Sequence, residues 1–241
     1  MRLSGLAQRH PEFLDLVDLP AALSLVTDVL GWNIFVYHSH LDVNTTSSTA
    51  GPFQYCWHQD MAGAIGPLAH PRPLLSIKVG YFLTDTSCPD RGNLWLVPGS
   101  HRREGLTPPA DPAQAVEGAM PVLAPAGSAL LLDPRVWHTR GANASSVTRK
   151  VLFYAYAYRW LRPRDDLRLT DRQWAELSPV HRQLLGGGDS LEGFYHPQES
   201  DVPLRAAPAR GRGLCRRWSC WAAPWPRWRG SLWAASSATN R

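Results

Sequence analysis

The segment Val151-Leu152-Phe153-Tyr154-Ala155-Tyr156-Ala157-Tyr158 is the strongest β-strand signal in this sequence. Its apolar and aromatic residues favour extended backbone. Segments of similar character, with a period of two, predict further strands at residues 32–38, 53–58, 74–83, 93–97 and 128–132. Turn-forming clusters separate them at residues 88–92, 98–100, 124–127 and 140–143. Many strands without interleaved helices indicate a mainly β chain that folds as an antiparallel barrel or jelly roll.

Helices are expected on both sides of this strand-rich region. In residues 12–30, apolar side chains recur at three- and four-residue steps, as in an amphipathic helix. Pro20 is expected to break this helix into two pieces, and Gly31 to end it. A further short helix is expected in residues 169–185, around Trp174 and Leu177.

Composition narrows the class of protein. The length of 241 residues allows one sizeable core. The net charge of +5 arises at one end, because residues 205–241 hold eight arginines and no acidic residue, which leaves residues 1–204 with a net charge of −3. A body of that charge does not indicate nucleic acid as a partner.

The sequence also argues against membrane and secretory classes. It contains no apolar run of about 20 residues, which a membrane span needs. The first ten residues lack the apolar region of a secretory signal, and four cysteines are too few for a disulfide framework. We therefore expect no membrane partner and a cytoplasmic location.

The sharpest chemical motif is Trp57-His58-Gln59-Asp60. Residues two apart on a strand point to the same side, so His58 and Asp60 present an imidazole and a carboxylate together. His138 follows an apolar strand, 78 residues after Asp60, and is the candidate third ligand. Two histidines and one carboxylate form the facial triad that binds Fe(II) and leaves three positions open. The alternative is a chance tripeptide and a surface histidine.

Arg149 lies eleven residues after His138, at the entry to the strong strand. A co-substrate with a distal carboxylate needs a two-pronged partner, which arginine provides and lysine does not. The alternative is an ordinary solvent-facing arginine beside Lys150.

The stretch from Leu83 to His101, which reads LTDTSCPDRGNLWLVPGSH, resembles the phytanoyl-CoA dioxygenase family. Members carry such a stretch between an HxD motif and a distal His and Arg pair, and all four parts occur here in order. The resemblance covers roughly residues 13–204. It implies a double-stranded β-helix, a cupin-like jelly roll with flanking helices, that binds Fe(II) and 2-oxoglutarate and uses O2.

The resemblance assigns roles to individual residues. His58, Asp60 and His138 would be the catalytic iron ligands, and Arg149 would bind the distal carboxylate of 2-oxoglutarate. Tyr55 falls where relatives place a residue near the co-substrate.

Further positions follow from the same resemblance. Lys78 and Asn33 lie on strands that line the pocket in such enzymes, so each could contact the co-substrate or face solvent. His101 of the PGSH motif would be a loop residue and not a ligand. Arg140 stands where relatives often have a small hydroxyl residue. His38, His40, His70 and Arg72 could face the mouth of the pocket.

The implied activity is hydroxylation of a small-molecule C–H bond, with release of succinate and CO2. The presence of Asp60 favours hydroxylation over halogenation, because a small residue replaces this carboxylate in halogenases. The substrate itself cannot be chosen from the sequence. The resemblance also implies that residues 1–204 form the oxygenase-like domain, with a short N-terminal part, whereas the Arg- and Trp-rich residues 205–241 are disordered or non-homologous.

Three other readings stay open. The chain could be a catalytically impaired, metal-binding β-barrel of the same family that serves as a scaffold. It could be a cupin-type metal enzyme without 2-oxoglutarate, for which Arg149 would be dispensable. The third alternative is nucleic-acid binding through the tail, where arginines would contact phosphates and tryptophans would stack on bases.

Overall fold

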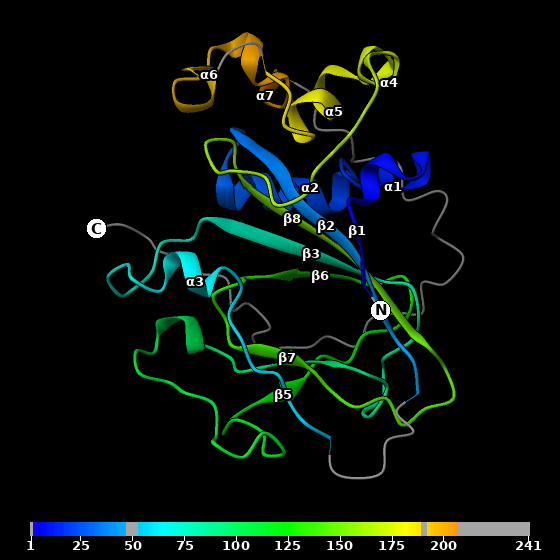
Figure 1. Ribbon diagram of the computed structural model, residues 1–241, viewed down its shortest axis with the longest axis vertical. Coiled ribbons are helices and arrows are strands. Elements are labelled where there is room, and N and C mark those ends of the chain that lie inside the picture. The colour runs from blue at the N-terminus through cyan, green and yellow to red at the C-terminus, as the bar shows by residue number, and fades with distance from the viewer. Residues whose placement is uncertain (1, 47–52, 189–191, 207–241) are drawn as a thin grey trace.

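Two antiparallel β-sheets form the body of the protein, as seen in a computed structural model that describes residues 2–46, 53–188 and 192–206. The larger sheet has the strand order β1-β2-β8-β3-β6, and the smaller has the order β5-β4-β7. Figure 1 shows the smaller sheet on one side of the larger sheet and helices on its other side. The strands are β1 (Arg2–Ser4), β2 (Ile34–Asn44), β3 (Ser76–Phe82), β4 (Leu94–Leu96), β5 (Met120–Pro121), β6 (Ala129–Leu132), β7 (His138–Arg140) and β8 (Arg149–Tyr158). The mainly β, antiparallel class with flanking helices is thereby confirmed.

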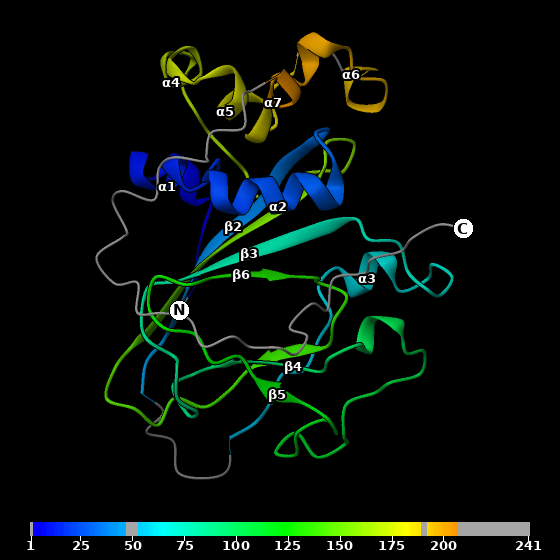
Figure 2. The ribbon, with the colours of Figure 1, turned by 180° about the vertical axis from the view of Figure 1, so that it is seen from behind.

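The expected N-terminal helix is indeed divided at Pro20, into α1 (Pro11–Asp15) and α2 (Pro20–Leu30). Proline is tolerated in the first turn of α2 because the N–H groups there have no intrahelical partner. Gly31 ends α2 with a φ of 76°, and its N–H donates to the carbonyl of Thr27. Figure 2 shows α2 lying across the larger sheet.

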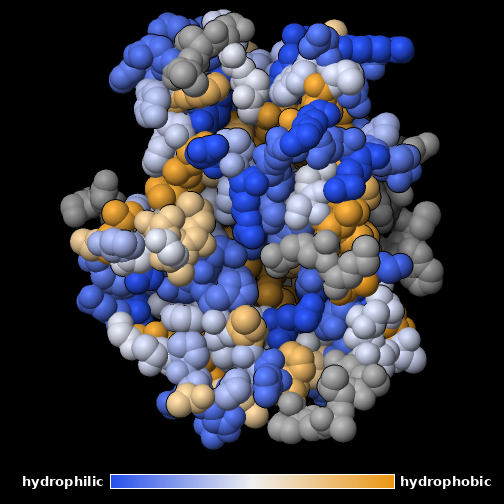
Figure 3. Space-filling model, viewed as in Figure 1, coloured by the Kyte–Doolittle hydropathy of each residue, from blue (hydrophilic) through white to orange (hydrophobic). Residues whose placement is uncertain are grey.

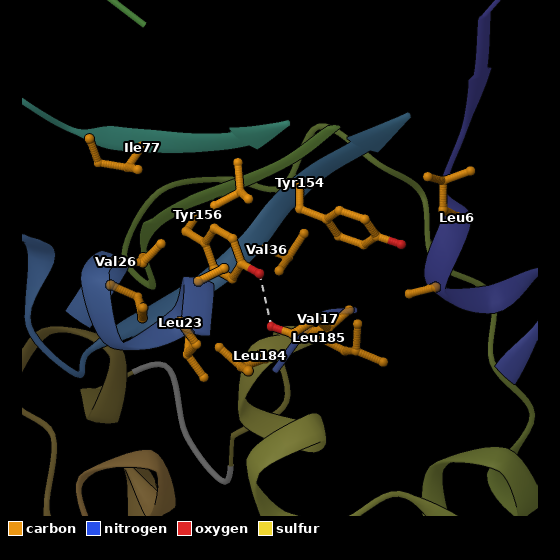
Figure 4. Packing of buried hydrophobic residues seen from close by; sticks show 14 of the residues in the cluster. Leu6, Val17, Leu23, Val26, Val36, Ile77, Tyr154, Tyr156, Leu184 and Leu185 are labelled. Carbon is orange, nitrogen blue, oxygen red and sulfur yellow. Dashed lines mark hydrogen bonds between the residues drawn. The ribbon is translucent and has the colours of Figure 1, made fainter. Parts of the chain in front are cut away.

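Alternate residues of the larger sheet face these helices and form the main apolar core. Figure 4 shows Val36, Ile77, Tyr154 and Tyr156 of the sheet beside Leu23 and Val26 of α2. Two buried tyrosines also hydrogen bond across the layer: Tyr156 donates to the carbonyl of Val17 at 2.9 Å and Tyr154 to that of Phe13 at 2.8 Å. The helical layer is therefore fixed to the sheet by polar as well as apolar contacts.

The interior between the two sheets receives the other residues of these strands, and on β2 they are polar. The register of β2 with β8 shifts between Val36 and His38, which is a β-bulge at Tyr37. Phe35 lies inside before the bulge, whereas His38, His40 and Asp42 lie inside after it. These three side chains are called the polar row of β2 below.

The sequence predicted β2 over residues 32–38 only, so its extent was wrong. The strand continues to Asn44 because β8 pairs with it along its whole length, down to the pair Asn44 and Arg149. The continuation of β2 could not be predicted from apolar alternation, because its inward residues are polar and the bulge interrupts the alternation.

The strand expected at residues 53–58 is also not formed as predicted. Among these residues only His58 makes a β-bridge, to His138. The N–H of Tyr55 donates to the carbonyl of Pro112, and that of Cys56 to the hydroxyl of Thr139. These donors go to a loop and a side chain, so no continuous ladder forms.

A C-terminal helical layer packs outside α2 and contains the helix expected at residues 169–185 as two short helices, α4 (Asp171–Glu176) and α5 (Pro179–Leu184). Thr170 caps the first and Ser178 the second. Buried Gln183 donates to the carbonyls of Trp32 and Ile34 and thereby ties this layer to β2. The remaining helices are η1 (Leu6–Gln8), α3 (Ala62–Ile65), η2 (Ser100–Arg102), α6 (Glu192–Tyr195), η3 (Glu199–Asp201) and α7 (Pro203–Ala206).

The predicted tail of residues 205–241 lies outside the described residues, apart from Arg205 and Ala206 at the end of α7. In the described ranges, every helix is too short or too polar to cross a bilayer. Figure 3 shows polar residues over most of the visible face, with apolar residues scattered among them. The cytoplasmic location stays a prediction.

Candidate metal and co-substrate site

The segment carrying His58 and Asp60 is hydrogen bonded to the segment that leads into β7. The backbones of His58 and His138 exchange two hydrogen bonds, at 3.0 and 2.9 Å, and the N–H of Asp60 donates to the carbonyl of Pro134 at 2.9 Å. This short pairing brings together three side chains that are up to 80 residues apart in the sequence.

One donor atom from each of His58, Asp60 and His138 lies within 4.8 Å of the other two. His138 Nε2 is 3.6 Å from one carboxylate oxygen of Asp60, and His58 Nε2 is 3.9 Å from the other. In the ranges that the structure describes, these residues form the only cluster of this kind. The sequence-predicted triad thus converges in space.

Backbone carbonyls determine which nitrogen of each histidine faces the cluster. His58 Nδ1 lies 2.9 Å from the carbonyl of Cys56, and His138 Nδ1 lies 2.7 Å from that of Val136. A carbonyl can only accept, so each Nδ1 carries a hydrogen and each Nε2 is the nitrogen left to bind a metal. This arrangement is typical of histidines that bind metals.

The charges within the cluster also suit a cation. Burial raises the pKa of Asp60, but Lys78 and His138 lower it more, so that its pKa is about 2. Burial lowers the pKa of His138 to about 4, against the opposing effect of Asp60. At neutral pH the cluster therefore contains an ionised carboxylate and a neutral imidazole, which are the protonation states of metal ligands. This donor set fits Fe(II).

Lys78 lies inside the site and not in solvent. It is buried on β3, and its ammonium group contacts the carboxylate of Asp60 and lies 5.6 Å from the ring centre of Phe153. Its suggested contact with the co-substrate stays a prediction.

Arg149 is likewise inside, which excludes the solvent-facing alternative. Only 2% of it is exposed, and its Nη1 donates to the carboxylate of Asp42 at 2.7 Å. Its Nε is buried without a hydrogen-bond partner among the described residues. A buried donor of this kind is available to a ligand, since buried polar groups are normally paired.

The structure does not bring Asn33 to the cluster. Asn33 precedes β2, and its side-chain amide donates to the carbonyl of Phe194 in the helical layer at 2.9 Å. Of the two possibilities for Asn33, contact with the co-substrate or with solvent, this hydrogen bond does not support the first. Tyr55 is half-buried in an aromatic group, with ring centres 5.8 Å from Trp57 and 6.0 Å from Trp95. Its expected role near the co-substrate stays a prediction.

The polar row of β2 was only partly anticipated. His38 and His40 are buried side by side, with ring centres 4.8 Å apart, and their expected place at the mouth of the pocket stays a prediction. Asp42 was not singled out, although its spacing from the two histidines was visible in the sequence. His101 is buried on η2 outside the cluster, as expected.

Comparison with known proteins agrees with this site. The family model "Phytanoyl-CoA dioxygenase (PhyH)" matches residues 2–151. The uncharacterized protein Rv1501 of Mycobacterium tuberculosis is 27% identical over 198 residues, which are 78% of this chain and 69% of that protein. The dioxygenase andF of Emericella variicolor is 32% identical over 116 residues, or 47% of this chain and 39% of that protein.

Solved structures that share the fold include HygX and ThoJ. HygX from Streptomyces hygroscopicus with iron bound has a TM-score of 0.57 at 16% identity, and the match covers 69% of this chain and 75% of HygX. The non-heme monooxygenase ThoJ has a TM-score of 0.53 at 23% identity, and the match covers 70% of this chain and 66% of ThoJ. The expected jelly roll is confirmed, and the chain belongs to the phytanoyl-CoA dioxygenase family of Fe(II)- and 2-oxoglutarate-dependent dioxygenases.

Proposed function

We propose that this protein hydroxylates a C–H bond of a small molecule, using Fe(II), 2-oxoglutarate and O2 and releasing succinate and CO2. The convergence of His58, Asp60 and His138 carries the proposal, because both histidines turn a free Nε2 toward an ionised carboxylate. The family to which the chain belongs supports it.

In this proposal the three residues of the cluster hold Fe(II), and Arg149 binds the distal carboxylate of 2-oxoglutarate. When bound, the iron and the keto acid supply O2 activation and the oxidative power for C–H hydroxylation. The chain itself contributes ligand orientation and a fixed guanidinium. It also contributes an interior from which Phe82, Val151 and Phe153 exclude water.

An anaerobic titration with Fe(II) and 2-oxoglutarate tests the binding half of this proposal without a known substrate. We expect the weak visible charge-transfer band of an iron-chelated keto acid. His58→Ala should abolish the band. His101→Ala, which replaces a buried histidine outside the cluster, should keep it.

Succinate formation then distinguishes the remaining alternatives. Turnover that requires both Fe(II) and 2-oxoglutarate supports the hydroxylase. A metal-dependent reaction that persists in Arg149→Ala without 2-oxoglutarate would favour the cupin-type enzyme. A folded protein that binds metal but forms no chelate band would favour the scaffold.

A further inference from the structure

The carboxylate of Asp42 pairs with one nitrogen of the buried Arg149 guanidinium and leaves the Nε side of the group without a partner among the described residues. Nη1 of Arg149 donates to Asp42 Oδ2 at 2.7 Å, whereas Nε has no partner among the described residues. A guanidinium can present Nε and one Nη in parallel to both oxygens of a carboxylate. With Nη1 held by Asp42, the edge that remains is the one formed by Nε and Nη2.

Two features of the backbone fix this geometry. Asn44 lies opposite Arg149 in the register of β2 and β8, so Asp42 is its diagonal neighbour on the inner face. Gly92, with a φ of 69°, packs against the stem of Arg149, and a Cβ atom there would lie 3.0 Å from Arg149 Cδ. The absence of a side chain at Gly92 therefore leaves room for the stem of Arg149, and the direction of the guanidinium depends on what holds its tip.

The charge balance of this group is also informative. Arg140 approaches the other oxygen of Asp42 at 3.4 Å, and its side chain is 44% exposed. Two guanidinium groups and one carboxylate leave one positive charge, which a single ligand carboxylate would neutralise. Asp42 is shared between a buried and a half-exposed guanidinium, so it compensates the buried charge of Arg149 only in part, and this favours an anionic ligand at Arg149.

We propose that Asp42 is a positioning residue that holds Nη1 of Arg149 and thereby directs the Nε–Nη2 edge toward the distal carboxylate of the keto-acid co-substrate. This inference rests on the proposed function, because it assumes that Arg149 binds that carboxylate. The alternative is that Asp42 competes with the ligand for Arg149.

The two roles predict opposite changes in affinity. If Asp42 positions Arg149, Asp42→Ala should weaken 2-oxoglutarate binding about tenfold, as is common when a supporting residue is lost. Asp42→Asn keeps an oxygen that accepts from Nη1 and removes only the negative charge, so it should bind 2-oxoglutarate at least as well as the wild type. If Asp42 competes, Asp42→Ala should bind more tightly than the wild type.

Calorimetric titration of the full chain, loaded anaerobically with redox-inert Mn(II), measures these affinities. 2-Oxopentanoate is the control ligand. It has the chain length and the keto-acid end of 2-oxoglutarate, but a methyl group in place of the distal carboxylate. Its affinity should be the same in the wild type and in Asp42→Ala. Glu176→Ala, which removes the exposed ion pair with Arg172, is the matched variant and should bind both ligands normally.

The outcomes separate the inference from the function beneath it. Wild-type protein that binds neither Mn(II) nor 2-oxoglutarate overturns both. If the wild type binds both, full or improved 2-oxoglutarate affinity in Asp42→Ala overturns the positioning role alone. An equal loss of affinity for 2-oxopentanoate also overturns it, since that loss would reflect general damage. If Asp42→Ala does not fold, weaker 2-oxoglutarate binding in Asp42→Asn overturns it.

Discussion

Lys78 shows how one side chain can influence the metal site without being a ligand. Its ammonium group contacts the carboxylate of Asp60, where a metal ion would place its own positive charge. Two cations compete for one carboxylate, and the repulsion between them is strong in a buried site.

We therefore expect Lys78→Met to bind Mn(II) several-fold more tightly than the wild type, as measured by calorimetric titration at neutral pH. The exposed Lys150 on β8 provides the control, because Lys150→Met should leave the affinity unchanged. Weaker Mn(II) binding in Lys78→Met would mean that the ammonium group mainly orients Asp60.

At the residue scale, the sequence predicted the three members of the cluster, because the HxD spacing and the distal histidine are chemically distinctive. It did not predict Asp42, since no motif marks that residue. It left open whether Asn33 contacts the co-substrate or faces solvent, whereas a hydrogen bond to Phe194 directs that side chain to the helical layer. Such contacts depend on a segment 161 residues away and leave no local signal.

Among the elements, β8 connects the two sides of the larger sheet. Its outward tyrosines hydrogen bond to the carbonyl of Phe13 in α1 and to that of Val17 between α1 and α2, and its inward face carries Phe153 and Arg149. Tyr156 is fully buried, and burial raises the pKa of its hydroxyl well above the usual value, so it remains a neutral donor to Val17.

Tyr156→Phe should destabilise the protein by about 1–3 kcal/mol, because the buried carbonyl of Val17 loses its donor. Urea denaturation measures this change. Tyr158→Phe, at the half-buried end of the same strand, should cost much less. Equal losses in the two variants would show that the hydrogen bond to Val17 is not the cause.

The bulge in β2 is held by residues 164 and 165. The N–H groups of Arg164 and Asp165 donate to the carbonyl of Tyr37 at 2.8 and 3.2 Å. The carboxylate of Asp165 lies 2.6 Å from His38 Nδ1 and accepts from the N–H of Ser39. Burial raises the pKa of Asp165, but these two contacts lower it more, so its pKa lies below the usual value.

A carboxylate with a lowered pKa stabilises the folded state above its unfolded pKa of about 3.9. This contribution is lost as the pH falls from that value through the lower folded pKa. Asp165→Asn should therefore be less stable than the wild type at pH 7, and the difference should shrink below about pH 4. Denaturant titrations at both pH values measure it, and a difference independent of pH would contradict the ionic role.

On the scale of the whole molecule, all the residues assigned to the site lie between Asp42 and Arg149, within the region matched by the family model. Deleting residues 207–241 should therefore leave Mn(II) affinity and melting temperature unchanged. If the tail binds nucleic acid, the deletion should remove that binding alone. Loss of Mn(II) binding on deletion would show that the tail supports the site.

The overall architecture was predictable because several apolar strands and their turns follow one another clearly in the sequence. The part of β2 after the bulge was not predictable, because the inward side chains of its polar row do not produce an alternation of apolar and polar residues. If side chains alternated strictly between the two faces from Ile34 to Asn44, then His38, His40 and Asp42 would also lie on the helical face with Val36. The extra residue at Tyr37 reverses that phase.

The bulge has a consequence for how homologous chains should be aligned. Removing one residue at Tyr37 would leave every later side chain of β2 on its present face, whereas a strand of unchanged length without the bulge would exchange the two faces. A relative with a regular strand is therefore expected to show a one-residue gap at this point. In such a relative, the counterpart of Asp42 is found only after the gap is introduced, and an ungapped alignment would compare it with Leu41.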